Sequence, residues 1–194
     1  MGMKLEPTRA TLGPSQAYIK HYSTSTSNPA IFTMIAISTV LVALVGYALA
    51  ESHQVSMINN CGSGTPVFLD EANANFQGSG TVQGQLLGGI AWLNGFSGAD
   101  CLSSGVNCGA VEFTLRNDAP NQNAADFTLE AQSENGNHQF TYPMFFEYLG
   151  GGACNGLSDS CPSAGDCPNA FTDPTNGKPL QCLGENAGIK ITFC

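Results

Sequence analysis

Apolar and polar residues alternate with a period of two in three stretches of the chain. Val111, Phe113 and Leu115 would face one way along a strand, while the polar residues between them face the other. The stretches 125–132 and 189–193 repeat this alternation. Each stretch therefore predicts a β-strand with one buried face and one face in water.

No segment after residue 50 carries a long run with the helical period of 3.6. The segment 55–60 predicts a short strand, and the Gly-rich segment 77–89 predicts turns between short strands. Trp92, the only tryptophan, is expected in the core. Many short strands bounded by Gly, Asn and Pro, with no repeat or linker, indicate an all-β sandwich in a single domain.

The first fifty residues are expected to be separate from this domain. The run 31–50 is apolar, carries no charge and ends in Ala-Leu-Ala, a pattern typical of signal peptidase sites. We therefore expect residues 31–50 to be a signal peptide, preceded by a leader at 1–30 that is a gene-model extension if Met34 is the true start. A signal anchor is the alternative, because the run is about long enough to span a bilayer. Both interpretations leave residues 51–194 outside the cell.

The net charge of residues 51–194 limits the kinds of molecule that this domain can bind. Residues 51–194 contain 3 Lys or Arg and 14 Asp or Glu, a formal charge of −11. Such a surface repels phosphate backbones and anionic lipids. We therefore expect no nucleic-acid binding and no stable membrane association after signal cleavage, whereas an uncharged polymer is compatible with this charge.

The cysteines indicate a disulfide framework. All 8, an even number, lie after residue 60, in the segment expected outside the cell. This is typical of a disulfide framework formed in an oxidising compartment, so we expect a secreted protein in the extracellular space or cell wall. Cys194 ends the chain and Cys61 lies near the start of the mature protein, so the two ends look tied together. Cys101 and Cys108 enclose a short polar loop that favours a local disulfide. Counting alone leaves the other pairs open.

The carboxyl end carries the most specific motif. CPNAF begins at Cys167 and is followed by Cys182 and then by IKITFC, which ends at Cys194. This order resembles the carboxyl end of thaumatin-like proteins, where C-P-x-A-F/Y, a cysteine and V-T-F-C occur. The segments INNC, GGIAW, VEFTL and FTYPM are similar to further family segments in the same order. The resemblance spans residues 54–194 and is strongest to the small secreted fungal members.

The resemblance implies a flattened antiparallel β-sandwich without the extra disulfide-rich domain of the large members. It also implies a pairing of all eight cysteines. On the chain-entropy model, the bridge between the two ends would stabilise the fold by on the order of 4 kcal/mol. The implied pairs are Cys61 with Cys194, Cys154 with Cys182, Cys161 with Cys167, and Cys101 with Cys108.

Large thaumatin-like proteins have an acidic cleft of one arginine, one glutamate and three aspartates. The cleft is associated with β-1,3-glucan binding and, in some members, with weak glucan hydrolysis. Carried over to this chain, the glutamate falls on Glu112. The arginine falls near Leu93 or Asn94, and one aspartate falls on His138. Neither substitution preserves the family's side chain.

The two other aspartates have uncertain counterparts. One falls near Ser133 or, with a gap, on Glu130 or Asp126. The last falls on Asp173, with shifted spacing. One member of the family's cleft is therefore retained, two are uncertain and two are lost.

The expected function follows from this partial match. We expect a secreted monomer that binds cell-wall β-glucan without catalysis and needs no cofactor. The alternative is a weak endo-β-1,3-glucanase in which Glu112 acts with Asp126 or Asp173, because glycoside hydrolysis needs two carboxyl groups flanking the scissile bond. A secreted antimicrobial or effector protein is a third class.

Plainer interpretations remain open for these residues. Glu112 could be a solvated carboxylate or a partner of Arg116 on the same strand face, and Asp173 could be a turn residue. Tyr142 and Tyr148 are candidates for stacking on sugar rings, although the aromatic residues around them are expected mostly in the core.

No metal site is expected. One unusual copper site would combine the amine and the ring of His53 with His138 as a third nitrogen ligand, a set of donors that copper favours. It would require processing that removes Glu51 and Ser52 and makes His53 the N-terminal residue.

Overall fold

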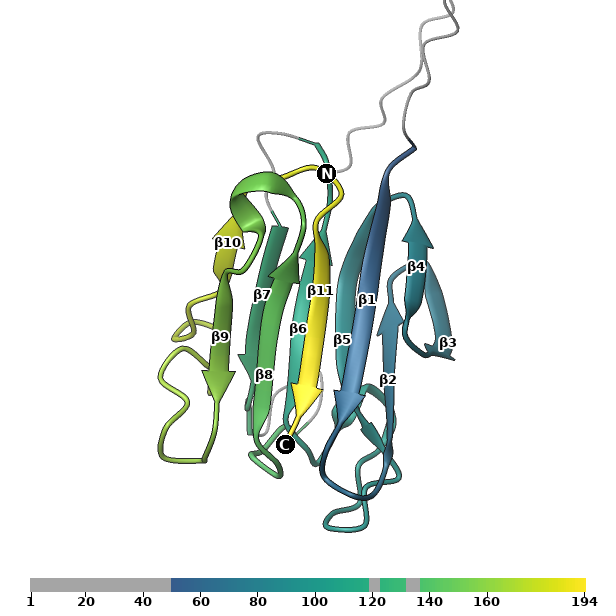
Figure 1. Ribbon diagram of the computed structural model, residues 1–194. Coiled ribbons are helices and arrows are strands. Elements are labelled where there is room, and N and C mark those ends of the chain that lie inside the picture. The colour runs from purple at the N-terminus through teal and green to yellow at the C-terminus, as the bar shows by residue number, and fades with distance from the viewer. Residues whose placement is uncertain (1–49, 119–122, 132–136) are drawn as a thin grey trace, which may run out of the picture. The chain divides into compact units, whose positions relative to one another are not determined.

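The computed structural model describes residues 50–118, 123–131 and 137–194 (Figure 1). All of these described residues belong to one compact unit of the chain. The expected leader and almost all of the expected signal peptide lie outside the described residues. Among the residues described, no helix has the length and apolar character needed to cross a membrane.

The described segments are built from strands and two short 3-10 turns, η1 (Ser103–Gly105) and η2 (Gly152–Cys154). The strands, in chain order, are β1 (Ser52–Asn59), β2 (Thr65–Asp70), β3 (Asn73–Gln77), β4 (Gly80–Gln83), β5 (Leu86–Asn94), β6 (Ala110–Leu115), β7 (Asn123–Thr128), β8 (Met144–Leu149), β9 (Ser158–Cys161), β10 (Leu180–Cys182) and β11 (Gly188–Phe193).

The strands form two sheets that pack face to face. One sheet has the order β4-β1-β11-β8-β9, and the other has the order β10-β7-β6-β5-β2-β3. Figure 1 looks onto the five-stranded sheet, with the six-stranded sheet behind it. All neighbouring strands are antiparallel except β1 and β11, which run parallel. The predicted all-β sandwich is confirmed.

The alternation in the sequence sets the core between the sheets. Val111, Phe113 and Leu115 of β6 are buried, whereas Glu112 between them is exposed. In β11, the buried residues Gly188, Ile189, Ile191 and Phe193 flank the half-buried Lys190 and Thr192. Lys190 pairs with Glu147 of β8 on the outer face, with 2.6 Å between Nζ and Oε2.

Two strand boundaries differ from the prediction. β1 begins at Ser52 because residues 52–55 pair with β4, which the sequence pattern did not mark as a strand. β7 ends at Thr128, opposite Ala110, the first residue of β6. The alternation continues past residue 128 in the sequence, but the partner strand has ended there.

Four disulfides join parts of the sandwich, and all four match the pairing implied by the resemblance. The Cys61–Cys194 bond joins the residues just after β1 and β11, which are 133 positions apart. Cys154 follows β8 and Cys182 ends β10, so their bond links the two sheets. The other two bonds, Cys101–Cys108 and Cys161–Cys167, close short loops. This framework indicates folding in an oxidising compartment.

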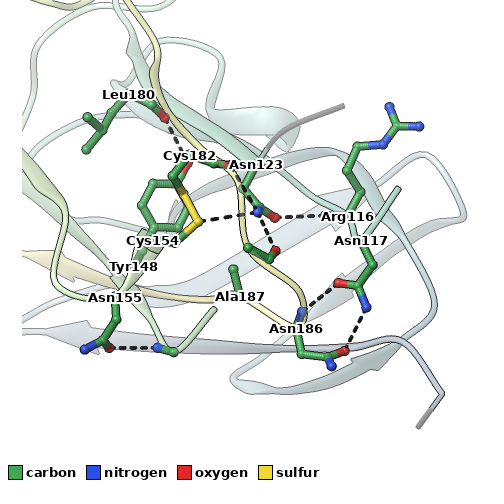
Figure 2. Close-up of a disulfide and its surroundings, with 12 residues drawn as sticks. Arg116, Asn117, Asn123, Tyr148, Cys154, Asn155, Leu180, Cys182, Asn186 and Ala187 are labelled. Carbon is green, nitrogen blue, oxygen red and sulfur yellow. Dashed lines mark hydrogen bonds between the residues drawn. A yellow bond between two sulfur atoms is a disulfide. The ribbon is translucent and has the colours of Figure 1, made fainter. Parts of the chain in front are cut away.

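Asn123 organises the junction around the bond between the sheets (Figure 2). Its Oδ1 accepts a hydrogen bond from the Arg116 N–H at 2.9 Å. Its Nδ2 donates to the carbonyl oxygens of Gly184 at 2.9 Å and Cys182 at 3.3 Å. Because the side chain is fully buried, these bonds satisfy groups that have no access to water.

The bond between the chain ends should contribute more to stability than a local bond. Replacing Cys61 and Cys194 together by serine is expected to lower the free energy of unfolding by about 4 to 5 kcal/mol, because the bond closes a very long loop in the unfolded chain. The matched control replaces Cys101 and Cys108, which are 7 positions apart, and is expected to cost about 2 to 3 kcal/mol. Urea unfolding of the oxidised proteins measures both, and an equal loss in the two variants would contradict the prediction.

Candidate functional site

A hollow of about 480 Å³ lies on the outward face of the six-stranded sheet, over β5, β6 and β7. It is rimmed by residues of the loops before and after these strands. The lining residues are Gly88, Gly89, Ile90, Ser104, Glu112, Phe113, Thr114, Ala124, Asp126 and His138.

The strand register places two carboxyl groups side by side in this hollow. Glu112 of β6 lies directly opposite Asp126 of β7. Residues opposite one another in an antiparallel pair have Cβ atoms roughly 5 Å apart and point to the same face. Ile90 of β5 flanks Glu112 on its other side. The structure therefore brings together two of the three predicted catalytic candidates.

Two glycines of β5 line the hollow and set the backbone path of this strand. The pairing of β5 with β6 shifts register between Leu86 and Gly89, as in a β-bulge. Gly88 has φ +58°, a conformation that favours glycine, and its N–H lies 3.3 Å from the Thr114 Oγ1 that accepts its hydrogen bond. At Gly89, a Cβ atom would lie only 2.8 Å from the Phe113 ring. Both glycines are therefore needed for this local backbone path.

Asp126 is the more perturbed of the two carboxyl groups. Burial, together with the neighbouring charges of Glu112 and Glu130, raises the pKa of Asp126 to about 7. Its Oδ1 is buried and has no hydrogen-bond partner within the described part of the chain. A buried acceptor without a partner is unfavourable, which favours either a proton on this carboxyl group or a ligand that donates to it.

Glu112 remains open to solvent in the same hollow. Its surroundings still limit hydration of the carboxylate, and this desolvation, followed by the charge of Glu130, raises the pKa of Glu112. Because the more exposed carboxyl group keeps more of its hydration, Glu112 should release its proton before Asp126 as the pH rises. The pair therefore has an ionised member and a protonated member over part of the acidic to neutral range.

His138 forms a neutral edge of the hollow. Its ring is buried, and Nδ1 lies 3.1 Å from the Cys108 carbonyl oxygen, to which it must donate. Burial lowers the pKa of His138, so the imidazole is neutral above the acidic range. Cys108 belongs to the loop closed by the Cys101–Cys108 bond, which therefore helps to position this ring.

The other candidates from the acidic cleft do not join the pair. Asp173 lies in an exposed turn, where its Oδ1 accepts bonds from the Thr175 N–H at 2.8 Å and hydroxyl at 2.7 Å, and these bonds lower its pKa. The turn interpretation of Asp173 is confirmed, and Asp173 is not among the residues that line the hollow. Glu130 does not line the hollow but raises the pKa of both carboxyl groups. Ser133 lies outside the described residues.

The arginine of the family's cleft has no replacement at the hollow. Leu93 is buried in the core, and neither Leu93 nor Asn94 lines the hollow. Arg116 forms an ion pair with Asp118, so the interpretation of Glu112 as its partner is not confirmed.

Both tyrosines proposed to stack on sugar rings are buried, and this prediction is wrong. Tyr142 is 1% exposed and Tyr148 is 0% exposed. The Tyr142 hydroxyl donates to the Gly109 carbonyl at 2.9 Å and accepts from the Leu93 N–H at 3.1 Å. The Tyr148 hydroxyl donates to the Leu180 carbonyl at 3.0 Å (Figure 2). Their hydroxyl groups form hydrogen bonds with the backbone, and a polysaccharide cannot reach their rings.

The proposed copper donors also lie in separate places. His53 is fully buried in β1, with Nδ1 2.7 Å from the Ala187 carbonyl oxygen and Nε2 3.0 Å from Glu51 Oε1. His138 lies at the outer face of the other sheet. In the described ranges, no group of three or more His, Cys, Asp or Glu residues is placed to hold a metal ion.

Comparison with known proteins does not indicate a function for this chain. The chain matches no model of a known protein family, and a search of curated proteins finds no match. The thaumatin-like resemblance therefore remains a prediction from the motifs. The hollow with its paired carboxyl groups is the feature from which a function can be inferred.

The hydroxyl groups of the two buried tyrosines should contribute to the stability of the fold. Tyr142→Phe removes a hydroxyl that bonds two buried backbone groups, so it is expected to lower the free energy of unfolding by about 1 to 3 kcal/mol. Tyr148→Phe is the matched control, because it loses one bond to a carbonyl that is only partly buried, and its loss should be smaller. Chemical denaturation measures both variants. A larger loss for Tyr148→Phe would contradict the assignment of Tyr142.

The raised pKa of Asp126 predicts a pH dependence of stability. Because its folded pKa of about 7 lies above the ordinary value of 3.8, the folded protein keeps a proton that the unfolded chain releases. This contribution is full below pH 3.8 and is lost as the pH rises through about 7. Asp126→Asn should therefore gain stability relative to wild type as the pH rises from 3.8 to about 7.

Denaturation at several pH values measures the difference between Asp126→Asn and wild type, so that the titration of other groups cancels. Asp173→Asn is the matched control. The lowered pKa of Asp173 predicts the opposite sign, with stability lost at acidic pH. A stability difference for Asp126→Asn that does not change with pH would contradict the raised pKa.

Proposed function

We propose that this chain is a small secreted thaumatin-like protein that binds the β-glucan of cell walls in the hollow around Glu112 and Asp126. The observation that carries this proposal is the pair of adjacent carboxyl groups, one with an unpartnered buried oxygen, in a hollow of about 480 Å³. The motif resemblance and the disulfide framework support it. The binding does not require catalysis.

The chemistry of the hollow favours a neutral ligand rich in hydroxyl groups. A ligand hydroxyl can donate to the carboxyl groups of Glu112 and Asp126, which both line the hollow, whereas an apolar ligand offers them no hydrogen bond. An anionic ligand would meet the charges of Glu112 and Glu130, which already raise the pKa of Asp126. A neutral sugar therefore satisfies the site better than a phosphate, a carboxylate or a lipid tail.

Hydrolysis of the same glucan is the second candidate. Asp126, with a pKa of about 7, could protonate a glycosidic oxygen, while ionised Glu112 acts as base or nucleophile. The side-by-side register is compatible with the short carboxyl separations that glycosidases use. Binding without turnover remains the main proposal, because the arginine and two aspartates of the family's cleft have no counterpart at the hollow.

The test combines retention on insoluble β-1,3-glucan with a reducing-end assay on laminarin. Glu112→Gln should weaken retention about 10- to 100-fold, as expected for the loss of a charged hydrogen-bond acceptor. Asp173→Asn changes an exposed carboxylate outside the hollow and should bind as wild type does. Wild-type retention without release of reducing ends is the expected result.

Other results separate the candidates. Release of reducing ends by wild type, lost in both Glu112→Gln and Asp126→Asn, would favour the glucanase. Equal retention of wild type and Glu112→Gln would contradict binding in the hollow. Absence of both retention and turnover would contradict the proposal and favour the antimicrobial or effector alternative.

A further inference from the structure

Phe76 of β3 is a large aromatic residue on the surface. Its side chain is 50% exposed, and it is the one aromatic residue among the exposed large apolar residues of the described segments. Its ring meets Trp92 edge to face, with centroids 5.3 Å apart and an interplanar angle of 87°. The ring is therefore supported from the protein side and open on the solvent side.

Phe76 and the hollow share the outward face of the six-stranded sheet. Ile90, which lines the hollow, and Trp92 are two positions apart in β5, so their side chains point to the same face. Phe76 contacts Trp92 and thus lies on this face as well. Its strand β3 is three strand positions from β6, which at the usual spacing is roughly 14 Å. That distance fits an oligosaccharide of several units.

Trp92 is held in place beneath Phe76. It is fully buried although it lies on the outer face, because the loop that contains η1 covers it. Gly105 of that loop approaches so closely that a Cβ atom there would lie 3.1 Å from the Trp92 Cβ. The indole Nε1 is buried and has no hydrogen-bond partner in the described segments. Two unpartnered buried polar atoms, Trp92 Nε1 and Asp126 Oδ1, thus come from the same sheet face.

The surroundings of Phe76 favour a sugar over a protein partner. β3 has the sequence Asn-Ala-Asn-Phe-Gln and carries no charge. None of the other exposed large apolar residues, Ile58, Leu102, Leu157 and Leu183, belongs to β3. A single aromatic ring among amides gives too little area for a stable protein interface but fits the apolar face of one sugar ring.

We propose that Phe76, supported by Trp92, is a second subsite for the same neutral polysaccharide. A sugar ring stacks on Phe76 while another unit of the same chain occupies the hollow at Glu112 and Asp126. This inference rests on the proposed function, because it assumes that the hollow binds a glucan. It adds that the protein selects chains long enough to reach from β6 to β3.

The fluorescence of Trp92 can be used to measure oligosaccharide binding. Trp92 is the only tryptophan of the chain, so its fluorescence reports directly on the neighbourhood of Phe76. Titration with long laminari-oligosaccharides should change this fluorescence, whereas a laminari-disaccharide, too short to occupy both subsites, should bind more weakly. Phe76→Ala should weaken binding of the long chain roughly three- to tenfold and leave disaccharide binding unchanged.

Two further variants keep the outcome interpretable. Phe76→Tyr preserves a stacking ring and should bind as wild type does. Leu183→Ala removes another exposed apolar side chain, 56% exposed, in the segment after β10, and should have no effect. Loss of long-chain binding in Phe76→Ala but not in Phe76→Tyr supports the subsite. Equal long-chain binding by Phe76→Ala and wild type overturns it.

The Glu112→Gln variant separates failure of the subsite from failure of the proposed function. If Glu112→Gln weakens binding of both ligands while Phe76→Ala changes neither, the subsite is overturned and the hollow remains the binding site. If Phe76→Ala weakens binding but Glu112→Gln does not, the hollow is not occupied and both proposals are overturned as stated. If wild type binds neither ligand, both are likewise overturned.

Discussion

The pairing of β1 with β11 is the constraint on which the rest of the sandwich depends. β11 lies between β1 and β8, so the last strand of the chain completes the five-stranded sheet by joining the first strand to the rest of it. This parallel contact closes the longest loop in the domain and must offset a large loss of chain entropy. The Cys61–Cys194 bond next to both strands restricts the unfolded chain and thereby favours this closure. The buried side chains of β11 then cover one side of the core.

The candidate site depends on that core through the strand register. Because Val111, Phe113 and Leu115 are fixed inside, Glu112 must face outward, and its antiparallel partner Asp126 must face outward beside it. If β6 and β7 were both shifted by one residue relative to the core, both carboxyl groups would point into the apolar interior. The same packing that stabilises the fold therefore creates an unfavourable pair of neighbouring acids on its outer face. Partial burial is the main reason why the pKa values of both carboxyl groups are raised; the charge of Glu130 adds to both shifts, and the charge of Glu112 adds to that of Asp126.

Burial and neighbouring negative charges both disfavour the ionised forms of Glu112 and Asp126. In the proposed site, neutral sugar hydroxyl groups would bond to the carboxyl groups lining the hollow without adding charge, and the exposed ring of Phe76 would add an apolar contact farther along the same face. The formal charge of −11 on residues 51–194 also favours an uncharged polymer over an anionic one. These features support the proposed recognition of a glucan chain by a sheet surface, with the disulfide-stapled core as a rigid base.

The sequence alone determined the fold class, because the alternation in β6 and β11 and the absence of a helical period reflect local rules that need no partner. The resemblance to thaumatin-like proteins implied a cysteine pairing that all four disulfides match. The site was only partly predictable: Glu112 was identified from its motif, but its partnership with Asp126 rather than Asp173 depends on how β6 and β7 pair. The inward direction of Tyr142 and Tyr148, the covering of Trp92 by the η1 loop, and the exposure of Phe76 likewise depend on strand pairing and loop packing. These contacts join residues far apart in the chain, and no local pattern specifies which distant segments will meet.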